Sequence, residues 1–464
     1  MRELRLAALD VYNGMPMPKF GPDLSELDLD NIESYVEASS AMVDDWNKVP
    51  QEIRQTFEQL GIPQAEQSGL AGVGAQYDSE LVYHNIQQAV ADTGVVYMGL
   101  EAALHSNYAE IIQDKFMQLV PIDDHKFAAL HAAVWSGGSF VYVPRGVSVE
   151  FPLQSYYRFN APGAGQFEHT LIIVDDDADL HFIEGCSAPK YNVANLHAGC
   201  VEIYVGKNAH VKYSTVENWS KNMFNLNTKR AIVAEGGKIE WITGSFGSHV
   251  SMLYPCAILN GNGASMEYTG VSFAGQKQIL DTGVKVEHRA TNTRSIINAK
   301  SISKDGGINT FRNVVKITTD AKKSRSFTDC QSLMLDSLSK SETIPFFDIQ
   351  TDDAEVAHEA NIGKINTQEI EFLMSRGLQE DVARSLIVRG FANDVSKELP
   401  FEYAAEMNNL IKLEMSENMW WKTCFKFSTI AIVKTLIFTI FRAAKKLISL
   451  WYFFACEILP YKLW

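Results

Sequence analysis

The sequence predicts a mainly β protein whose central region fits a parallel β-helix. Two observations favour this architecture. Between residues 116 and 365, short strands of alternating apolar and polar residues follow one another without a helix of crossover length. Polar turns separate these strands at intervals of about 28 residues, and later of about 14. An antiparallel sandwich is the alternative, because alternation alone does not separate the two architectures.

The turns of this region are rich in Asp, Asn and Gly, which tolerate left-handed backbone. The clearest turn signals lie at residues 177–179, 207–209, 235–237, 261–263, 292, 305–307 and 320–321. A strand of the same alternating kind follows each turn. Such coils bury their apolar rows only by stacking on one another, which is how a solenoid is stabilised.

The N-terminal region, residues 1–115, is predicted to be mainly helical. Residues 30–35 and 50–57 both start with good helix N-terminal residues and carry apolar side chains at helical spacing. The first ten residues contain no apolar segment of signal-peptide length.

The C-terminal region, residues 366–415, is also predicted to be helical. Asn366 and Glu369 form a capping pair, and Gly377 ends the first helix. A second helix covers 380–388 and a third begins at Pro400. From residues alone, this region is a helical cap on the solenoid.

The tail, residues 416–464, differs in composition. From Met419 onward it carries a net charge of +6, against −21 for the rest of the chain. Its longest apolar segment, 425–441, includes two lysines and is marginal for a membrane span. Two interpretations stay open: a membrane anchor, or a tail produced by a frame change or a recombined 3′ end.

Composition excludes several classes of function. A net charge of −15 argues against nucleic-acid binding. Six dispersed cysteines without a C-x-x-C pair argue against a disulfide framework, a zinc ribbon or a ferredoxin-type site, and favour reduced thiols in a cytosol-like compartment. No phosphate-binding G-x-x-x-x-G-K-[ST] element is present, so any ATP-driven step requires a partner.

Cys186 is the first candidate for a chemical role. Gly185 permits a sharp exit from the preceding strand, and Pro189 stops the strand from continuing. This pattern predicts a thiol at a rigid strand end, near the surface, where it can meet a partner. The alternative is a small buried hydrophobic residue, the usual state of a free cysteine.

The residue sequences of several segments resemble those of the SufB family of iron–sulfur cluster assembly scaffolds. The matching segments are 133–140, 143–144, 186–191, 196–197, 201–203, 218–219, 228–230 and 374–377. The resemblance extends from the first residue to about Met415, and implies a right-handed parallel β-helix that serves as a scaffold rather than an enzyme. Both ends depart from the family: the chain is expected to lack an N-terminal segment, and its tail is atypical.

The resemblance implies roles for two cysteines. Cys186 would accept persulfide sulfur, and Cys330 would build the nascent cluster with Glu359 and the adjacent His358. Thiolate, imidazole and carboxylate groups can together hold an iron–sulfur unit. From spacing alone, a buried cysteine and a surface His-Glu pair are the simpler explanation of these residues. Many relatives carry Glu-His-Glu here, whereas this chain has Ala357 first and lacks one carboxylate.

Sulfur transfer between separated thiols requires a protected route. Arg158 and Asn160 share a face by period two, and Thr215 and Lys229 occupy corresponding strand positions. The resemblance implies a polar row at these four residues, in which cations would stabilise a thiolate or persulfide. The alternative is that these four residues are ordinary solvent-exposed surface residues.

The resemblance also implies cofactors and partners. The cofactor would be a transient iron–sulfur cluster, with reduced flavin as a further candidate. A SufC-type ATPase would dock on 366–415, a SufD-like paralogue or a second SufB copy on the β-helix, and a SufE- or SufU-type protein would donate sulfur in the cytoplasm or a plastid stroma. Nucleic acid is not expected as a partner, and a membrane only if the tail is genuine. The competing functions are a carbohydrate-active β-helix enzyme and a SufD-like structural partner.

Overall fold

The computed structural model describes residues 1–37, 42–45, 48–49, 51, 70–189, 192–399 and 401–416. The helix predicted at 50–57 and the atypical tail fall almost entirely outside this range, as does Pro400. The chain divides into two compact units, Met1–Leu410 and Ile411–Trp464. The solenoid and all candidate sites belong to the first unit.

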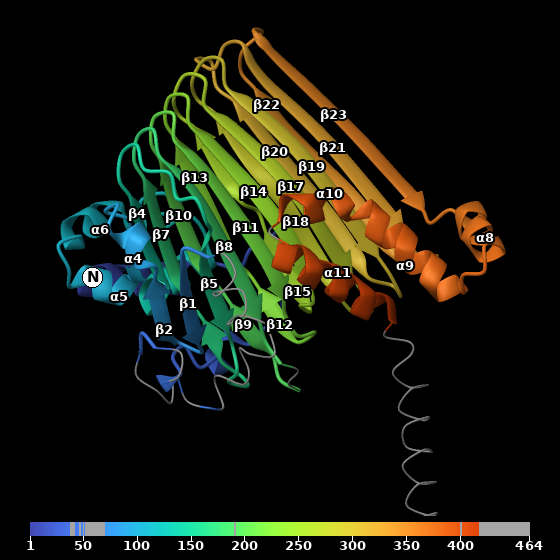
Figure 1. The fold of residues 1–464 in the computed structure, drawn as a ribbon, viewed down its shortest axis with the longest axis horizontal. Helices are drawn as coiled ribbons and strands as arrows, with labels where there is room; N and C mark the ends of the chain where they lie inside the picture. Colours follow the sequence, from blue (N-terminus) through green and yellow to red (C-terminus); the bar gives the residue numbers. More distant parts are fainter. Residues whose placement is uncertain are drawn as a thin grey trace, which may run out of the picture. The chain divides into compact units, whose positions relative to one another are not determined.

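Two sheets form a parallel β-solenoid of about eight turns between residues 140 and 364, with helices at both ends (Figure 1). The predicted parallel β-helix is therefore confirmed, and the antiparallel sandwich is wrong. Sheet 1 contains, in spatial order, β2 (Glu80–Ile86), β1 (Gly72–Tyr77), β5 (Leu153–Arg158), β8 (Asp179–Ser187), β11 (His210–Asn218), β14 (Lys238–Phe246), β17 (Ser265–Ala274), β19 (Arg294–Ser303), β21 (Ser324–Met334) and β23 (Ala354–Lys364).

Sheet 2 has thirteen strands and is more branched, because some coils contribute two short strands where others contribute one long strand. It contains β3 (Val96–Gly99), β4 (Ser139–Val143), β7 (His169–Val174), β10 (Cys200–Val205), β13 (Thr228–Val233), β16 (Cys256–Leu259), β18 (Ile279–His288), β15 (Val250–Leu253), β12 (Met223–Asn225), β9 (Asn195–His197) and β6 (Gly165–Gln166), with β20 (Ile308–Ile317) and β22 (Lys340–Ile349) following β18.

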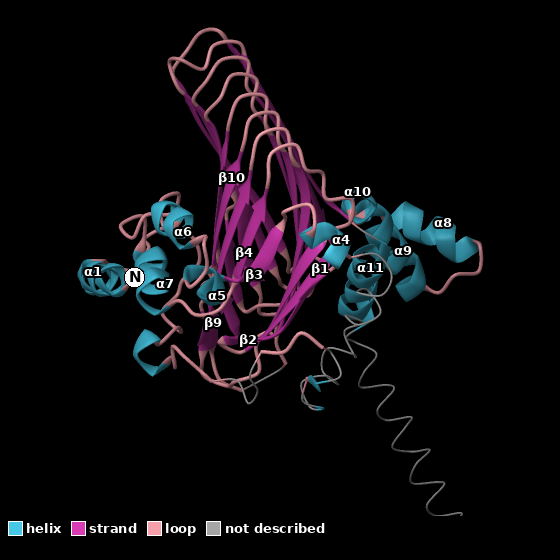
Figure 2. Ribbon diagram, turned by 60° about the vertical axis from the view of Figure 1, so that its left-hand side comes forward, coloured by secondary structure: helices cyan, strands magenta, loops and turns pink. Residues whose placement is uncertain are grey.

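The turns that lead into the strands of sheet 1 stack on one another, as Figure 2 shows. The turns before β8, β11, β14, β17, β19 and β21 each contain a residue with left-handed backbone, which explains the Asp, Asn and Gly in the predicted turns. Asp177 has a φ of 58° and Asn208 a φ of 53°. The Asn208 side chain donates to Asp177 Oδ1 at 3.0 Å, so neighbouring turns are also hydrogen-bonded.

The apolar core lies between the two sheets. Phe182 and Tyr213, from neighbouring strands of sheet 1, stack with ring centroids 5.5 Å apart. Ile203 and Val233 oppose them from sheet 2 and are fully buried. Burying one such large apolar side chain contributes about 1.5–3 kcal/mol, so the stacked rows stabilise every coil through its neighbours.

The described part of the N-terminal region contains strands as well as the predicted helices. The helices among its described residues are α1 (Arg2–Gly14), η1 (Leu29–Asn31), α4 (Gln88–Ala91), α5 (Leu100–Leu104) and α6 (Ala109–Lys115), and they are accompanied by β1, β2 and β3. Strand β1 pairs in parallel with β5 and antiparallel with β2, and so extends sheet 1 beyond its first coil, whereas β3 pairs antiparallel with β4 of sheet 2. Helix α7 (Lys126–Val134) then covers the outer face of sheet 2, where Ala128 and Ala132 pack against Leu171.

The C-terminal region is helical, as predicted. It contains α8 (Thr367–Ser375), α9 (Glu380–Phe391), α10 (Asn393–Glu398) and α11 (Phe401–Ser416). The Asn366 side chain caps α8 by accepting the Gln368 N–H at 2.9 Å, and Gly377 follows with a φ of 92°. Lys300 of β19 donates to Asp394 of α10 at 2.6 Å, which ties the helices to sheet 1.

Within the described part of the chain, none of the helices combines the length and apolar character required to span a membrane.

Candidate functional site

Cys186 lies inside the solenoid, and not at an exposed strand end as predicted. Strand β8 continues through Gly185 to Ser187, and only 1% of Cys186 is exposed. The glycine is required for packing, because a Cβ at Gly185 would lie 2.6 Å from the ring of Tyr156. The absence of a side chain at Gly185 therefore allows a close approach between strands and does not end β8.

Charged side chains surround the Cys186 thiol. Its Sγ lies 3.7 Å from Glu184 Oε1, to which the thiol donates. Lys229 Nζ donates to the same oxygen at 2.7 Å and to Thr215 Oγ1 at 2.9 Å, and the Tyr213 hydroxyl donates to Glu184 Oε2. Thr215 and Lys229 therefore meet beside Cys186. They do so from opposite sheets, on β11 and β13, and not from corresponding strand positions as predicted.

The electrostatics favour a protonated thiol at Cys186. Burial, reinforced by Glu184, raises the pKa of Cys186 well above its ordinary value, and Lys229 only partly opposes this shift. Burial also disfavours charge on Glu184, but Lys229 and Tyr213 hold the pKa of Glu184 below its ordinary value. The buried carboxylates outweigh the single cation, contrary to the expectation that cations dominate this path.

The polar interior continues from Cys186 towards sheet 2. Asn225 Nδ2 donates to Glu217 Oε2 at 2.9 Å, and Asn225 Oδ1 lies 2.7 Å from His197 Nδ1. His197 Nε2 lies 2.5 Å from Glu168 Oε1. All four side chains are buried, so Glu217, Asn225, His197 and Glu168 form one hydrogen-bonded chain across the coil.

Two rows of inward-facing residues run along sheet 1 from the Cys186 coil to the Cys330 coil. The parallel register aligns the first row as Glu184, Thr215, Thr243, Gly270, Ala299 and Cys330. It aligns the second row as Cys186, Glu217, Ser245, Ser272, Ser301 and Ser332. Every residue of the second row is buried, and Ser272 Oγ donates to Ser301 Oγ at 3.4 Å.

The sequence contained a signal for these rows that motif analysis missed. Each member of the second row stands nine residues after the left-handed residue of its turn, as Cys186 stands after Asp177 and Glu217 after Asn208. The first row stands seven residues after the same positions. Alignment of the coils on their turns would therefore have identified the buried glutamates and serines.

Arg158 is the last residue of β5, and Asn160 follows that strand. Tyr157 is the register neighbour of Cys186, so Arg158 points to the opposite face, where its Nη1 donates to Ser187 Oγ at 2.9 Å. Asn160 lies beyond the end of β5, and its backbone N–H donates to the Asp78 carboxylate at 2.5 Å.

Cys330 lies on β21, one strand inside the last strand of sheet 1. It is 2% exposed and packs in the apolar core, where burial, with the nearby Asp329, raises its pKa to about 12. The register pairs Cys330 with Ala360 and Thr328 with His358, so the Cys330 and His358 side chains face the interior. Glu359 pairs with Asp329 and faces the other side of the sheet. The chain itself thus brings Cys330 and His358 to one face and leaves Glu359 on the other.

The last coil exposes apolar side chains. Phe347 on β22 is 36% exposed, and Ile362 on β23, which continues the Ser332 row, is 44% exposed. Among the described strands, β22 pairs only with β20 and β23 only with β21. His358 lies here as well, with its ring 6.0 Å from that of Phe347. This open end leaves strand edges and apolar surface available for pairing.

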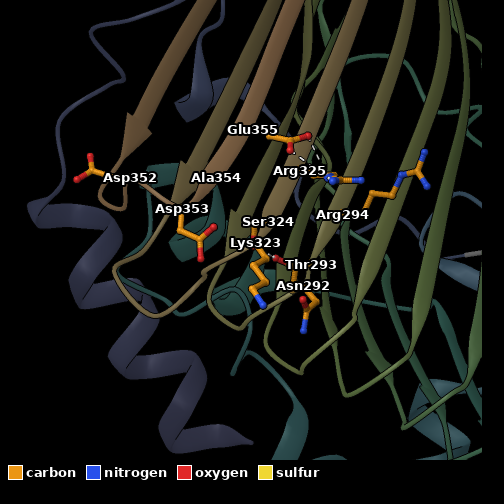
Figure 3. Close-up of a pocket in the computed structure, with 10 residues that line it drawn as sticks. All are labelled: Asn292, Thr293, Arg294, Lys323, Ser324, Arg325, Asp352, Asp353, Ala354 and Glu355. Atoms are coloured by element: carbon orange, nitrogen blue, oxygen red, sulfur yellow. Dashed lines mark hydrogen bonds and ion pairs between the residues drawn. The ribbon is translucent and has the colours of Figure 1, made fainter.

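A surface hollow of about 660 Å³ lies near the same end, at the starts of β19, β21 and β23 (Figure 3). Arg325 and Glu355 form an ion pair of 3.1 Å at its wall. Both side chains are largely exposed, and none of the lining residues is a cysteine or a histidine. The hollow is therefore separate from the thiol chemistry of the interior.

Comparison with known proteins identifies the family. Residues 157–391 match the model of the SufBD core domain of the SUF system for FeS cluster assembly, and residues 77–155 match the SufBD protein N-terminal region. This chain belongs to the SufBD family. It is similar to the iron–sulfur cluster assembly SufBD family protein of Staphylococcus epidermidis, with 48% identity over 415 residues, 89% of each chain. The corresponding protein of Staphylococcus saprophyticus is 47% identical over the same coverage.

The family membership assigns this chain to iron–sulfur cluster assembly by the SUF system. This assignment replaces the competing hypothesis that the chain is a carbohydrate-active β-helix enzyme.

Proposed function

We propose that this chain is a SufB-type scaffold that accepts sulfur at Cys186 and builds a nascent iron–sulfur cluster at Cys330. The observation that carries the proposal is the pair of aligned rows that connects the two cysteines through the interior of sheet 1. Five steps between neighbouring strands separate them, a distance of roughly 24 Å. A SufD-like structural partner would not need a thiol at each end of such a route.

The first chemical step is a transfer of sulfane sulfur. The Cys186 sulfur, after losing its proton, attacks the outer sulfur of a persulfide on a SufE- or SufU-type donor. A new S–S bond forms at Cys186, the S–S bond of the donor breaks, and the donor leaves as a thiolate. Glu184, which accepts the Cys186 hydrogen bond, is the proposed group for positioning that proton.

Two electrons and two protons then reduce the Cys186 persulfide, which breaks its S–S bond, restores the Cys186 thiol and releases the outer sulfur as sulfide. The sulfide moves along the polar interior, with Thr215 and Lys229 beside its starting point. In this proposal, Arg158 and Asn160 contribute only at the outer face of the coil that contains Cys186. Conversion of sulfane sulfur to sulfide requires two electrons, which we assign to reduced flavin. The sulfide combines with iron at Cys330, whose interior neighbour is His358.

Partner proteins are proposed for two surfaces. The open end, with its exposed apolar residues and strand edges, suits a SufD-like paralogue or a second copy of this chain. Glu359 would contribute to the assembly site from the outer face of β23, at that interface. Helices α8 and α9 expose Phe372, Val382 and Leu386, which supports docking of a SufC-type ATPase on 366–415.

A blocked interior distinguishes this scaffold from a structural partner. Ser272→Leu places a bulky side chain in the middle of the second row. We expect it to abolish cluster formation fed by persulfide on a donor and to preserve anaerobic reconstitution with iron and free sulfide, measured by charge-transfer absorbance. Cys330→Ala should abolish both, and Cys186→Ser only the first.

Cys256→Ser is the matched control, because Cys256 is a buried cysteine on sheet 2 outside both rows. It should leave both assays unchanged. Equal absorbance in the wild type and Cys330→Ala would reject the assembly site, and persulfide transfer unaffected by Cys186→Ser would favour the SufD-like alternative.

A further inference from the structure

Three buried side chains of metal-ligand type meet on the outer face of sheet 2, away from the interior rows. They are His131, His169 and Cys200, exposed by 1%, 0% and 2%. One ring nitrogen of each histidine and the cysteine sulfur all lie within 4.8 Å of one another. The register of β7 and β10 makes His169 and Cys200 direct neighbours, and α7 supplies His131 from above.

Hydrogen bonding determines which nitrogen of His131 faces the cluster with a lone pair. His131 Nδ1 lies 2.9 Å from the carbonyl oxygen of Ala198. Because a carbonyl only accepts, this nitrogen carries the proton. In the neutral ring, Nε2 is then an acceptor, and it lies 3.0 Å from His169 Nδ1.

A neutral His169 ring has only one N–H to donate, but its two nitrogens face two acceptors, His131 Nε2 and Glu202 Oε2. If His169 Nδ1 donates to His131, its Nε2 holds a lone pair that faces Glu202 Oε2 at 3.2 Å, where another acceptor stands. His169 Nε2 makes no hydrogen bond to the described residues. The Glu202 carboxylate already accepts backbone N–H groups of Met117, Leu119 and Val120 at 2.6, 2.7 and 2.9 Å.

We propose that His131 Nε2, His169 Nδ1 and Cys200 Sγ bind one divalent transition-metal ion, with zinc as the best chemical match. Imidazole nitrogen and thiolate sulfur are the usual zinc ligands. With the metal on Nδ1, His169 carries its proton on Nε2 and donates to Glu202, an arrangement in which a carboxylate orients a metal-bound histidine. The mismatch at His169 is thereby removed.

Geometry and charge both agree with this ion. Tetrahedral zinc would separate two ligand nitrogens by about 3.3 Å and a nitrogen from a sulfur by about 3.6 Å. His131 Nε2 and His169 Nδ1 lie 3.0 Å apart, and no two of the three ligand atoms are more than 4.8 Å apart, so only small adjustments of these side chains are required. Binding releases the Cys200 proton to solvent without any transfer of electrons. The two positive charges are then balanced by the Cys200 thiolate and the Glu202 carboxylate.

The site would join α7 to two strands of sheet 2, independently of sulfur transfer in the interior. Its role is thus a metal cross-link between the N-terminal helices and the solenoid. This inference does not depend on the proposed scaffold function.

Titration of the full chain with Co²⁺ and Zn²⁺ tests the site, in a Cys330→Ala background that removes the proposed assembly site. We expect one equivalent of Co²⁺ to produce thiolate-to-cobalt absorbance in the near ultraviolet and tetrahedral bands in the visible. Cys200→Ser should abolish the near-ultraviolet band and weaken Zn²⁺ binding by at least about tenfold. Cys256→Ser should change neither.

Glu202→Gln provides a second test, because the amide oxygen can still accept backbone N–H groups. It should weaken Zn²⁺ binding by about 10–100-fold while the thiolate band persists. The proposal is overturned if no stoichiometric metal binds to the folded chain, or if Cys200→Ser retains the thiolate band.

Discussion

The two candidate cysteines occupy opposite kinds of interior. Cys186 is surrounded by a carboxylate, an ammonium and hydroxyl groups, which form a connected network. Cys330 lies among apolar side chains of the core, beside Ala299 and Ala360 in the register. Both thiols are buried, and burial by itself raises the pKa of a thiol. The two sites therefore differ in which polar groups are available to a transferred sulfur.

This contrast teaches that the two coils are stabilised differently. In the Cys186 coil, buried charges of opposite sign stabilise one another in a low-dielectric interior. Removal of one charge leaves its partner buried without compensation, which lowers the free energy of unfolding. The Cys330 coil depends on apolar packing and on whatever covers the open end. Three further predictions sharpen the comparison, beginning with the largest effect.

Lys229→Met should destabilise the protein by about 3–5 kcal/mol, because it leaves Glu184 buried without its cation. Chemical denaturation measures the loss. Lys207→Met is the matched control, because Lys207 is 60% exposed in its pair with Glu235 and should change stability by less than about 0.5 kcal/mol. Addition of Glu184→Gln to Lys229→Met should restore part of the loss. Equal effects at the two lysines would show that the buried charges are not coupled.

His210 should make the stability of the Cys186 side of the solenoid depend on pH. Hydrogen bonds to Asp179, at 2.7 Å, and to Glu240, at 3.0 Å, raise the pKa of His210 to about 9. The stabilisation is therefore complete below the unfolded pKa of about 6.5 and is lost as pH rises through about 9. His210→Gln should flatten the dependence of the free energy of unfolding on pH within this window. A Lys207→Gln variant should keep it, and an unchanged profile in His210→Gln would contradict the assignment.

Asp329→Asn should produce the smallest effect, at the other cysteine. The Asp329 charge adds to burial in raising the pKa of Cys330, so its removal should increase alkylation of Cys330 by about two- to threefold at pH 9. Mass spectrometry of the alkylated peptides measures the rate. Alkylation of Cys186 in the same sample is the internal control and should not change. An acceleration of both cysteines would indicate local opening of the solenoid instead.

Much of the fold was predictable from residues close together in the chain. The turns at Asp177 and Asn208 require left-handed backbone, and their spacing reports the length of a coil. The Asn366 cap and the Gly377 stop are likewise local features of a helix. The strands at residues 72–86 were missed because β1 pairs with distant β5, and β2 joins the sheet only through β1; local propensity does not report the distant partner.

The candidate site was only partly predictable. Cys186 was predicted as the sulfur acceptor, and Thr215 and Lys229 as part of a polar path, but the contact between Thr215 and Lys229 depends on two sheets that face each other across the interior. The orientation of Cys330 relative to Glu359 is determined by alternation along β21 and β23, once the register is known. The meeting of His131 with His169 and Cys200 depends on the packing of a helix against a sheet.

The sequence by itself determined the coil length, the turn chemistry and the alternation of the strands, because these are short-range properties that repeat along the chain, and it thereby favoured a solenoid over a sandwich. Only the tertiary structure decided which side chains share an environment, since that depends on strand register and on the face that each coil turns inward. The same physical reason explains why Cys186 is buried among charges, although its own neighbours in the sequence indicated an exposed strand end.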